Sequence, residues 1–303
     1  STAHTLLDDG HSVFIVSRDR IEETTSMKAA AIWFPFEAAP ADKVERWSRQ
    51  TFDYYQRKIS EKHPGLQMVT LHVMDRPDQA ASWIGALPED HYRPLLRTEM
   101  TADYKFGYAV SVPMIDTSRY LPFLCDSFMN RGGSLQYQEI ESLSELTKEY
   151  DWVINCTGLG SAKLTGDDEL FPIRGQVVKI DAIPGISYRA DDHGPHALSY
   201  VIPRSDGIVL GGTATKGDAN QSASDVDTTG ILNRCRGLEP ALPEELNIKE
   251  IIVGLRPGRS AVRLETEVQK SIIHNYGHGG SGYTICWGCA LEVNSILQKA
   301  LHQ

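Results

Sequence analysis

Apolar residues along the chain follow two patterns, which predict strands and helices in turn. Residues 12–16 and 152–156 are continuous apolar runs that end at polar residues, as is typical of buried parallel strands. Apolar positions at helical spacing predict four helices, over residues 2–7, 41–62, 116–131 and 283–301. In the third of these we expect Leu121, Leu124, Cys125 and Phe128 to face inward.

The middle of the chain has a different pattern. Residues 68–74 alternate between apolar and polar side chains, which predicts a half-buried strand. Short β-branched runs separated by turn residues predict further strands at 177–180, 200–202, 208–210 and 249–254. The ends of the chain therefore favour an α/β fold and the middle a β-rich one.

A glycine-rich stretch, residues 274–284, lies directly before the last predicted helix. Gly277, Gly279, Gly280 and Gly282 leave room for a close approach of backbone to a ligand. The amides and the positive dipole end of the helix that follows favour negative charge. The stretch thus predicts a site for an anion, a phosphate or an electron-rich ring.

Charge and cysteine content narrow the possible partners. The net charge of −10 over 303 residues argues against non-specific nucleic-acid binding and against a basic membrane patch. No apolar run reaches the roughly 18 residues of a membrane span. Five cysteines and the lack of a signal-peptide pattern favour a reducing compartment. We expect a cytoplasmic protein, or a peroxisomal one in a eukaryote, although the final Ala300-Leu301-His302-Gln303 is not a peroxisomal address.

Two side chains next to predicted strands are candidates for binding a small molecule. Arg256 follows the strand 251–253 beside Pro257 and Gly258, and its planar guanidinium suits a carboxylate. Tyr200 begins a strand, so its hydroxyl is a candidate for facing a pocket. A surface salt bridge for the arginine and a half-buried strand tyrosine are the ordinary alternatives.

Other motifs favour plain structural roles. Cys286 and Cys289 have redox spacing, but they lie inside a predicted helix and favour core packing. The ten histidines have no metal-ligand spacing, so we expect no metal. Three acidic groups are expected to be solvated loops: Asp8-Asp9, Asp167-Asp168-Glu169 and Asp191-Asp192.

Seven segments in order resemble one known family. They are residues 29–36 (Ala-Ala-Ala-Ile-Trp-Phe-Pro-Phe), 155–158 (Asn-Cys-Thr-Gly), 174–176 (Arg-Gly-Gln), 200–203 (Tyr-Val-Ile-Pro), 210–213 (Leu-Gly-Gly-Thr), 254–257 (Gly-Leu-Arg-Pro) and 274–280 (His-Asn-Tyr-Gly-His-Gly-Gly). With this order and spacing, the chain resembles the D-amino-acid oxidase and D-aspartate oxidase family of FAD-dependent flavoenzymes over nearly its whole length.

The resemblance implies a fold and a reaction. The fold would be α/β, with a Rossmann-like FAD-binding domain formed by residues 1–58, 117–175 and 255–303. A β-rich substrate-binding domain would comprise residues 59–116 and 176–254. The reaction would be the oxidation of a D-amino acid by FAD and oxygen to a 2-oxo acid, ammonia and hydrogen peroxide. A homodimer is compatible with this resemblance.

The resemblance also assigns roles by position. Arg256 would pair with the substrate carboxylate, Tyr200 would hydrogen-bond it, and the Gly280 carbonyl would receive the substrate amine. The flavin ring would lie on Gly279, Ser281, Gly282, Tyr283 and Thr284. The rest of FAD would be held by Ser17, Arg18, Thr24, Thr25, Ser26, Thr157 and Gly158. Hydride transfer to the cofactor requires no general base from the protein.

The chain departs from the family pattern at several places. The family's first strand and its Gly-x-Gly-x-x-Gly motif precede the position of Ser1, so we expect either a longer natural protein or weaker flavin binding. His196 stands where the family has a lid tyrosine, and Ala214 where D-aspartate oxidases have an arginine. Arg204 or Lys216 would have to replace that arginine, and Phe34 stands where a polar residue often lines the pocket. We therefore expect neutral or apolar D-amino acids, with a D-aspartate oxidase or a weakly flavin-binding, non-catalytic homologue as alternatives.

Overall fold

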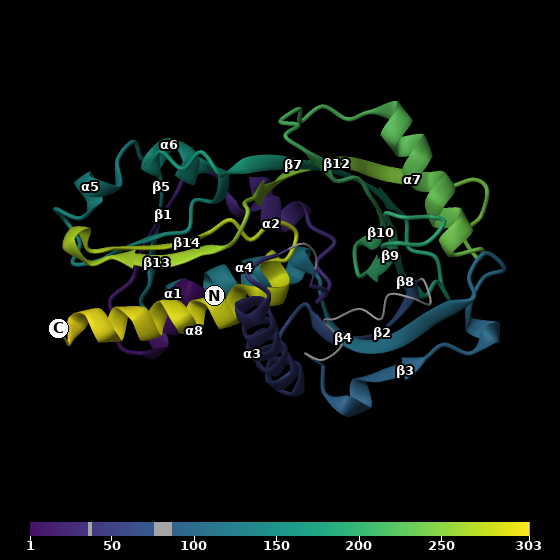
Figure 1. The fold of residues 1–303 in the computed structure, drawn as a ribbon, viewed down its shortest axis with the longest axis horizontal. Helices are drawn as coiled ribbons and strands as arrows, with labels where there is room; N and C mark the ends of the chain where they lie inside the picture. The colour runs from purple at the N-terminus through teal and green to yellow at the C-terminus, as the bar shows by residue number, and fades with distance from the viewer. Residues whose placement is uncertain (36–37, 76–86, 303) are drawn as a thin grey trace.

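Two long antiparallel strands cross the molecule and join its two halves (Figure 1). They are β7 (Phe171–Ile180) and β12 (Ile248–Gly258), which pair along their whole length. One half holds most of the helices and several short strands, and the other is mainly β-sheet. This computed structural model describes residues 1–35, 38–75 and 87–302.

The larger sheet contains both long strands. Its order is β11-β7-β10-β9-β8-β2-β4-β3, with β12 also paired to β7. All its neighbours are antiparallel except β2 and β8, which run parallel. The remaining strands are β2 (Leu66–Asp75), β3 (Tyr92–Pro94), β4 (Phe106–Ile115), β8 (Tyr188–Asp191), β9 (Ser199–Arg204), β10 (Gly207–Gly211) and β11 (Thr215–Lys216).

Alternation along these strands separates the two faces of the sheet. Val178 and Val201 pack with Ile231 of helix α7 (Asp225–Leu238) on one face. Val177 and Ile202 belong to a different core cluster on the opposite face. Successive residues on these strands therefore face α7 and the centre of the molecule in turn.

The helix-rich half contains two further pairs of parallel strands. Strand β1 (Phe14–Ser17) pairs with β5 (Ser134–Tyr137), and β6 (Val153–Asn155) pairs with β14 (Ile272–Tyr276). Strand β13 (Arg263–Glu267) is antiparallel to β14. The α/β class expected from the sequence is confirmed, and the parallel pairs of this half lie in two separate small sheets.

Two long helices pack closely beneath these strands. They are α3 (Ala41–Ser60) and α8 (Gly282–Leu301), and α1 (Thr2–Asp8) also contacts α8. Leu6, Trp47 and Val293 form part of their shared core. The other helices are α2 (Thr25–Lys28), α4 (Thr117–Asn130), α5 (Leu143–Leu146), α6 (Ser161–Thr165) and α7.

The long helices and strands expected from the sequence are present, but the inward face of α4 differs from the prediction. Leu121, Leu124 and Cys125 are only half-buried, whereas Tyr120 and Phe128 are buried. The Tyr120 ring lies against Tyr55, with ring centroids 6.1 Å apart. The buried face is centred on an amphipathic tyrosine that a purely apolar pattern omits.

The prediction that residues 167–169 form a solvated loop is wrong for Asp167. The Asp167 side chain is only 5% exposed. It accepts hydrogen bonds from Arg259 at 3.0 Å and from the Tyr276 hydroxyl at 2.9 Å. Burial favours the neutral acid, but these donors keep the pKa of Asp167 below its ordinary value. Asp167 therefore ties the end of β14 to the neighbouring loops.

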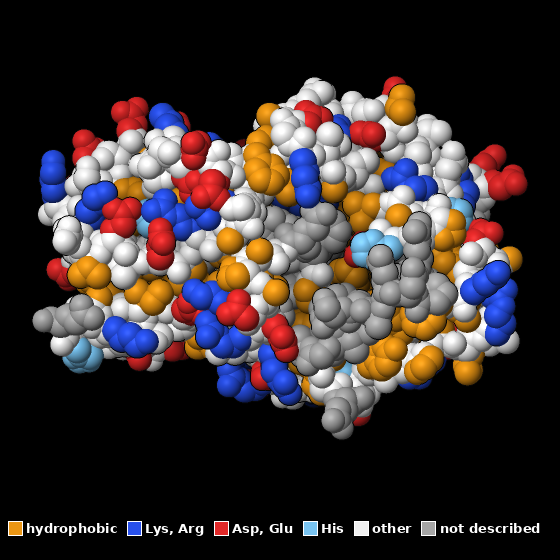
Figure 2. Space-filling view, viewed as in Figure 1, with side chains coloured by type: hydrophobic (Ala, Val, Ile, Leu, Met, Phe, Trp, Pro, Cys, Tyr) orange, Lys and Arg blue, Asp and Glu red, His pale blue; other side chains and the backbone are white. Residues whose placement is uncertain are grey.

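The surface carries charges of both signs. On the face seen in Figure 2, acidic and basic side chains are interspersed with apolar ones. Within residues 1–35, 38–75 and 87–302, no helix combines the length and apolar character that crossing a membrane requires.

Candidate active site

The glycine-rich stretch forms a tight loop between β14 and α8. Gly277 and Gly279 have φ values of 83° and 53°, in the left-handed region that glycine tolerates best. The Gly279 amide donates to the Pro257 carbonyl at 2.9 Å, which fastens the loop to the end of β12. The Ser281 carbonyl accepts from the amides of Thr284 and Ile285 and so closes the first turn of α8. The loop is thus held next to Arg256.

Arg256 and Tyr200 meet above two glycines. The Arg256 guanidinium donates to the Thr213 carbonyl at 3.1 Å and to the Tyr200 hydroxyl. A Cβ at Gly175 would lie 2.2 Å from Nη1 of Arg256, and one at Gly211 would lie 2.0 Å from the Tyr200 ring. Both side chains therefore occupy space that only glycine leaves open.

The electrostatics of this pair favour a carboxylate ligand. Burial raises the pKa of Tyr200 above its ordinary value, and the Arg256 charge only partly opposes that shift. Tyr200 therefore stays a neutral hydroxyl that can donate a hydrogen bond. A fixed guanidinium beside it offers further charged donors to the same ligand.

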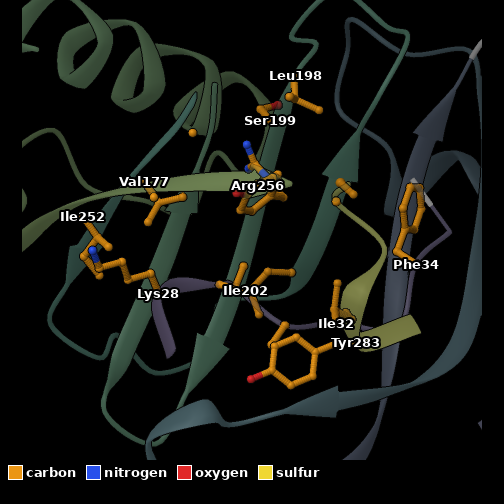
Figure 3. A pocket seen from close by; sticks show the side chains of 18 of the residues that line it. Lys28, Ile32, Phe34, Val177, Leu198, Ser199, Ile202, Ile252, Arg256 and Tyr283 are labelled. Atoms are coloured by element: carbon orange, nitrogen blue, oxygen red, sulfur yellow. The ribbon is translucent and has the colours of Figure 1, made fainter. Parts of the chain in front are cut away.

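A cavity of about 1040 Å³, including its open mouth, lies in front of this pair (Figure 3). Its polar side chains are Thr25, Lys28, Asp192, Ser199, Tyr200, Arg256 and Tyr283. Much of its wall is apolar, with Ile32, Phe34, Leu71, Val177, Ile202 and Ile252. The cavity thus combines a few polar groups with an apolar wall, as small-molecule sites do.

Five predicted site residues line this cavity. Arg256, Tyr200, Gly280, Thr25 and Tyr283 come from four separate parts of the chain. In Figure 3 Arg256 lies towards the Leu198–Ser199 end, and Tyr283 lies at the opposite end beside Ile32. The fold thus brings the substrate candidates and part of the flavin loop to one space.

The other residues predicted to hold the flavin ring, Gly279, Ser281, Gly282 and Thr284, are not part of the cavity lining. Ser281 and Thr284 are buried, and an added Cβ at Gly282 would meet no atom within 4 Å. The Thr284 hydroxyl donates to the Phe34 carbonyl at 2.9 Å and accepts from the Phe34 amide at 3.0 Å. Thr284 therefore joins α8 to residues 29–35 here, and its contact with a flavin stays a prediction. Phe36, the last residue of the resembling segment, lies outside the described residues.

The candidates for the adenosine and pyrophosphate side lie outside the cavity lining, Thr25 excepted. Thr24 caps α2, accepting from the Met27 amide at 3.2 Å, and the Ser26 carbonyl accepts from the Tyr283 hydroxyl at 3.0 Å. At the end of β1, Ser17 donates to the Asp19 carbonyl at 2.8 Å and Arg18 pairs with the Asp19 carboxylate at 2.7 Å.

Thr157 and Gly158 follow strand β6. The Thr157 hydroxyl donates to Asn155 at 2.8 Å, and a Cβ on Gly158 would lie 3.9 Å from Pro257. This turn therefore lies beside the end of β12, close to the glycine loop.

The prediction that Asp191-Asp192 is a solvated loop is wrong. Asp191 is completely buried, and Asp192 lines the cavity. Sequence patterns did not identify either residue, because their burial depends on contacts with distant segments. In the structure Asp191 ends β8 opposite Ser199 of β9, and Asp192 follows directly after the strand.

The residues considered as substitutes for a second arginine lie elsewhere. Arg204 binds Asp206 at 3.0 Å and the Ala29 carbonyl at 3.1 Å, so its guanidinium is already engaged. Lys216 and Ala214 are not part of the cavity lining. His196 pairs with Asp103 at 2.9 Å and likewise does not line the cavity.

Cys289 has the core setting that the sequence favoured, whereas Cys286 is only half-buried. Cys289 is buried inside α8, and burial raises the pKa of its thiol well above the ordinary value, as expected for core packing. In the described part of the chain, no three His, Cys, Asp or Glu side chains gather as metal ligands would.

Comparison with known proteins identifies the family. A family model described as "FAD dependent oxidoreductase" (DAO) matches residues 1–295. The chain belongs to this family. It is 35% identical to a D-amino-acid oxidase of Rubrobacter xylanophilus, over 99% of this chain and 93% of that protein. It is 33% identical to the D-aspartate oxidase of Homo sapiens, over 96% of this chain and 88% of that protein.

A solved structure supports the same fold. The FAD-bound L-alpha-glycerophosphate oxidase of Mycoplasma pneumoniae superposes with a TM-score of 0.81 and 14% identity, covering 98% of this chain and 91% of that one. The family membership makes this chain an FAD-dependent oxidoreductase.

Proposed function

We propose that this chain catalyses the oxidative deamination of D-amino acids, with FAD as the cofactor and oxygen as the acceptor. One D-amino acid, one oxygen and one water would give a 2-oxo acid, ammonia and hydrogen peroxide. The observation that carries the proposal is the Arg256–Tyr200 pair, which lies on the same cavity as Gly280 of the glycine loop. The names of the relatives at 33–36% identity agree with it.

The site's own groups would bind and orient the substrate. Arg256 would take the α-carboxylate through its planar fork, and Tyr200 would donate to the same carboxylate. The Gly280 carbonyl would accept from the α-amine. Anchoring both groups fixes the direction of the Cα–H bond, so the protein's contribution is largely one of orientation.

The residues around the cavity fit the flavin part of FAD. Ala29, Ala30, Ala31, Gly175 and Gly254 line the cavity with little or no side chain, so backbone borders much of it. The N-terminus of α8 meets the cavity at Gly280 and Tyr283, where its dipole would stabilise negative charge. FAD, when bound there, supplies the two-electron chemistry that the protein's side chains lack.

We also propose the division into a discontinuous FAD-binding region and a substrate-binding region at the boundaries given above. Gly175 and Gly254, beside two of these boundaries, face each other in the β7–β12 register. Both line the cavity. The active site would then lie where the chain passes from one region to the other.

A spectroscopic and a chemical measurement test the proposed function. Protein loaded with FAD should show visible flavin absorbance and release peroxide with D-methionine but not with L-methionine. Bleaching of the flavin under nitrogen by the D-enantiomer should accompany this. Flavin-loaded protein that is reduced by neither enantiomer would be the non-catalytic homologue, and preferential use of the L-enantiomer would overturn the stereochemical assignment.

The state of Tyr200 gives a pH prediction. Its raised pKa means that the neutral hydroxyl persists above the ordinary tyrosine value of about 10. The kcat/KM of the wild type should therefore show no loss below about pH 10 from ionisation of Tyr200. Tyr200→Phe should lower kcat/KM about tenfold, the effect of one hydrogen bond, and leave the shape of the profile unchanged. An alkaline decline below pH 10 that Tyr200→Phe abolishes would contradict this.

A further inference from the structure

An acidic side chain shares the cavity with Arg256. Asp192 follows β8 and lines the cavity together with Ala190, two positions earlier. Asp191, between them, is buried on the opposite face, where it accepts from the Tyr104 hydroxyl. Strand alternation thus directs every second residue to the cavity, and Asp192 is one of them.

The turn that carries Asp192 is firmly held. The Asp191 carboxylate accepts from the Gly194 amide at 2.5 Å and from the His196 amide at 2.9 Å. A Cβ on Gly194 would lie 2.7 Å from that carboxylate. Asp191 therefore fixes the backbone of the turn, so the neighbouring Asp192 faces the cavity from a defined position.

Asp192 and Arg256 act on Tyr200 with opposite signs. The Arg256 charge lowers the pKa of Tyr200, and the Asp192 charge raises it by a smaller amount. The guanidinium is therefore the stronger electrostatic influence at the tyrosine hydroxyl, and the carboxylate the weaker one. A ligand whose α-carboxylate binds Arg256 would extend its other end towards Asp192.

The neighbours of Asp192 suit an aliphatic chain. Leu71, Ala190 and Leu198 line the same cavity. Methylene groups pack well on such a wall, while a terminal charge seeks a polar partner. Lys28, which lies over Gly254 of β12, would instead favour an acidic side chain. In Figure 3 Lys28 lies beside Ile252, away from Leu198 and Ser199.

We propose that Asp192 binds the cationic side chain of a basic D-amino acid, so that the preferred substrates are D-arginine and D-lysine. This inference rests on the proposed function of the same site. The fixed carboxylate would also repel D-aspartate and D-glutamate. The sequence predicted neutral or apolar D-amino acids as substrates. We replace that prediction with basic D-amino acids.

The experiment compares D-arginine with D-citrulline, which has nearly the same shape but no side-chain charge. The FAD-loaded wild type should have a kcat/KM at least about tenfold higher for D-arginine, as for a partly buried charge pair. Asp192→Asn should bring that ratio close to one, and Asp192→Lys should favour D-glutamate. Asp42→Asn, an exposed carboxylate on α3 outside the cavity, is the matched control and should leave the ratio unchanged.

Each other outcome has a distinct meaning. If the wild type oxidises D-methionine and D-citrulline but shows no preference for D-arginine, the side-chain assignment fails and the proposed function stands. An equal loss for all substrates in Asp192→Asn, with FAD content and circular dichroism unchanged, would place Asp192 at the α-amine and overturn the assignment. If flavin-loaded wild type oxidises no D-amino acid, both proposals fail.

Discussion

Replacement of Arg256 by alanine is expected to lower kcat/KM for D-amino acids about a thousandfold. Removing one partner of a buried, hydrogen-bonded charge pair costs about 4 kcal/mol, and each 1.4 kcal/mol is tenfold. The loss should appear both as a higher KM and as a lower kcat, because Arg256 would bind the substrate and also orient it. Steady-state peroxide release and the rate of anaerobic flavin bleaching measure the two effects.

Two further variants separate charge from geometry. Arg256→Lys keeps the positive charge but loses the planar fork, so its activity should lie between those of wild type and Arg256→Ala. Gly175→Ala should resemble Arg256→Ala, because the added Cβ would lie 2.2 Å from Nη1. Arg49→Ala, on the exposed side of α3, should behave as wild type. Near-normal kcat/KM in Arg256→Ala, with FAD fully bound, would overturn the carboxylate assignment.

Short-range spacing in the sequence was sufficient to predict individual helices, strands and the glycine loop. Helical spacing identified α3 and α8, because one buried face repeats at a fixed interval. The apolar runs identified β1 and β6 as strands, but the predicted burial of the first is wrong, since none of its residues is buried and Phe14 is 39% exposed. The glycine loop was equally evident, since four glycines before a helix leave few structural alternatives. The sequence identified Arg256 and Tyr200 as separate binding candidates, without indicating that they lie together. Their meeting above Gly175 and Gly211 depends on the register of four strands, β7, β9, β10 and β12, which the sequence does not reveal.

The acidic residues mark the limit of sequence analysis. Asp167 and Asp191 stand in short acidic runs with turn residues nearby, a pattern typical of solvated loops. Both are buried because distant tyrosines, Tyr276 and Tyr104, donate hydrogen bonds to them. Such pairings join segments more than 80 residues apart and have no signature in the surrounding sequence. The specificity role proposed for Asp192 follows from this unpredicted burial of its neighbour.

The contact between α3 and α8 leads to the largest expected effect on stability. Gly288 of α8 lies against the backbone of Trp47 in α3, and its amide donates to the Thr51 hydroxyl at 3.0 Å. A Cβ there would lie 2.4 Å from the Trp47 Cα and 2.5 Å from its carbonyl oxygen. Because these are backbone atoms, the clash can be relieved only if one helix moves.

Gly288→Ala is therefore expected to be strongly destabilising, although alanine favours helices. The helical preference contributes about 1 kcal/mol in favour of the variant. Overpacking against backbone costs about 3 kcal/mol or more, so the net loss is about 2 kcal/mol and Tm should fall by about 5 °C. Gly230→Ala in α7 is the matched control, since its Cβ would meet only the flexible Arg234 side chain at 3.1 Å.

That control should raise Tm slightly, because the gain in helical preference of about 1 kcal/mol is not offset by a backbone clash. Thermal unfolding should be followed for both variants at one fixed FAD concentration, since a ligand that binds only the folded state raises Tm by mass action. A Tm of Gly288→Ala equal to or above that of the wild type would mean that α3 and α8 separate at little cost. The close backbone contact would then not determine how α8 is placed beneath the glycine loop.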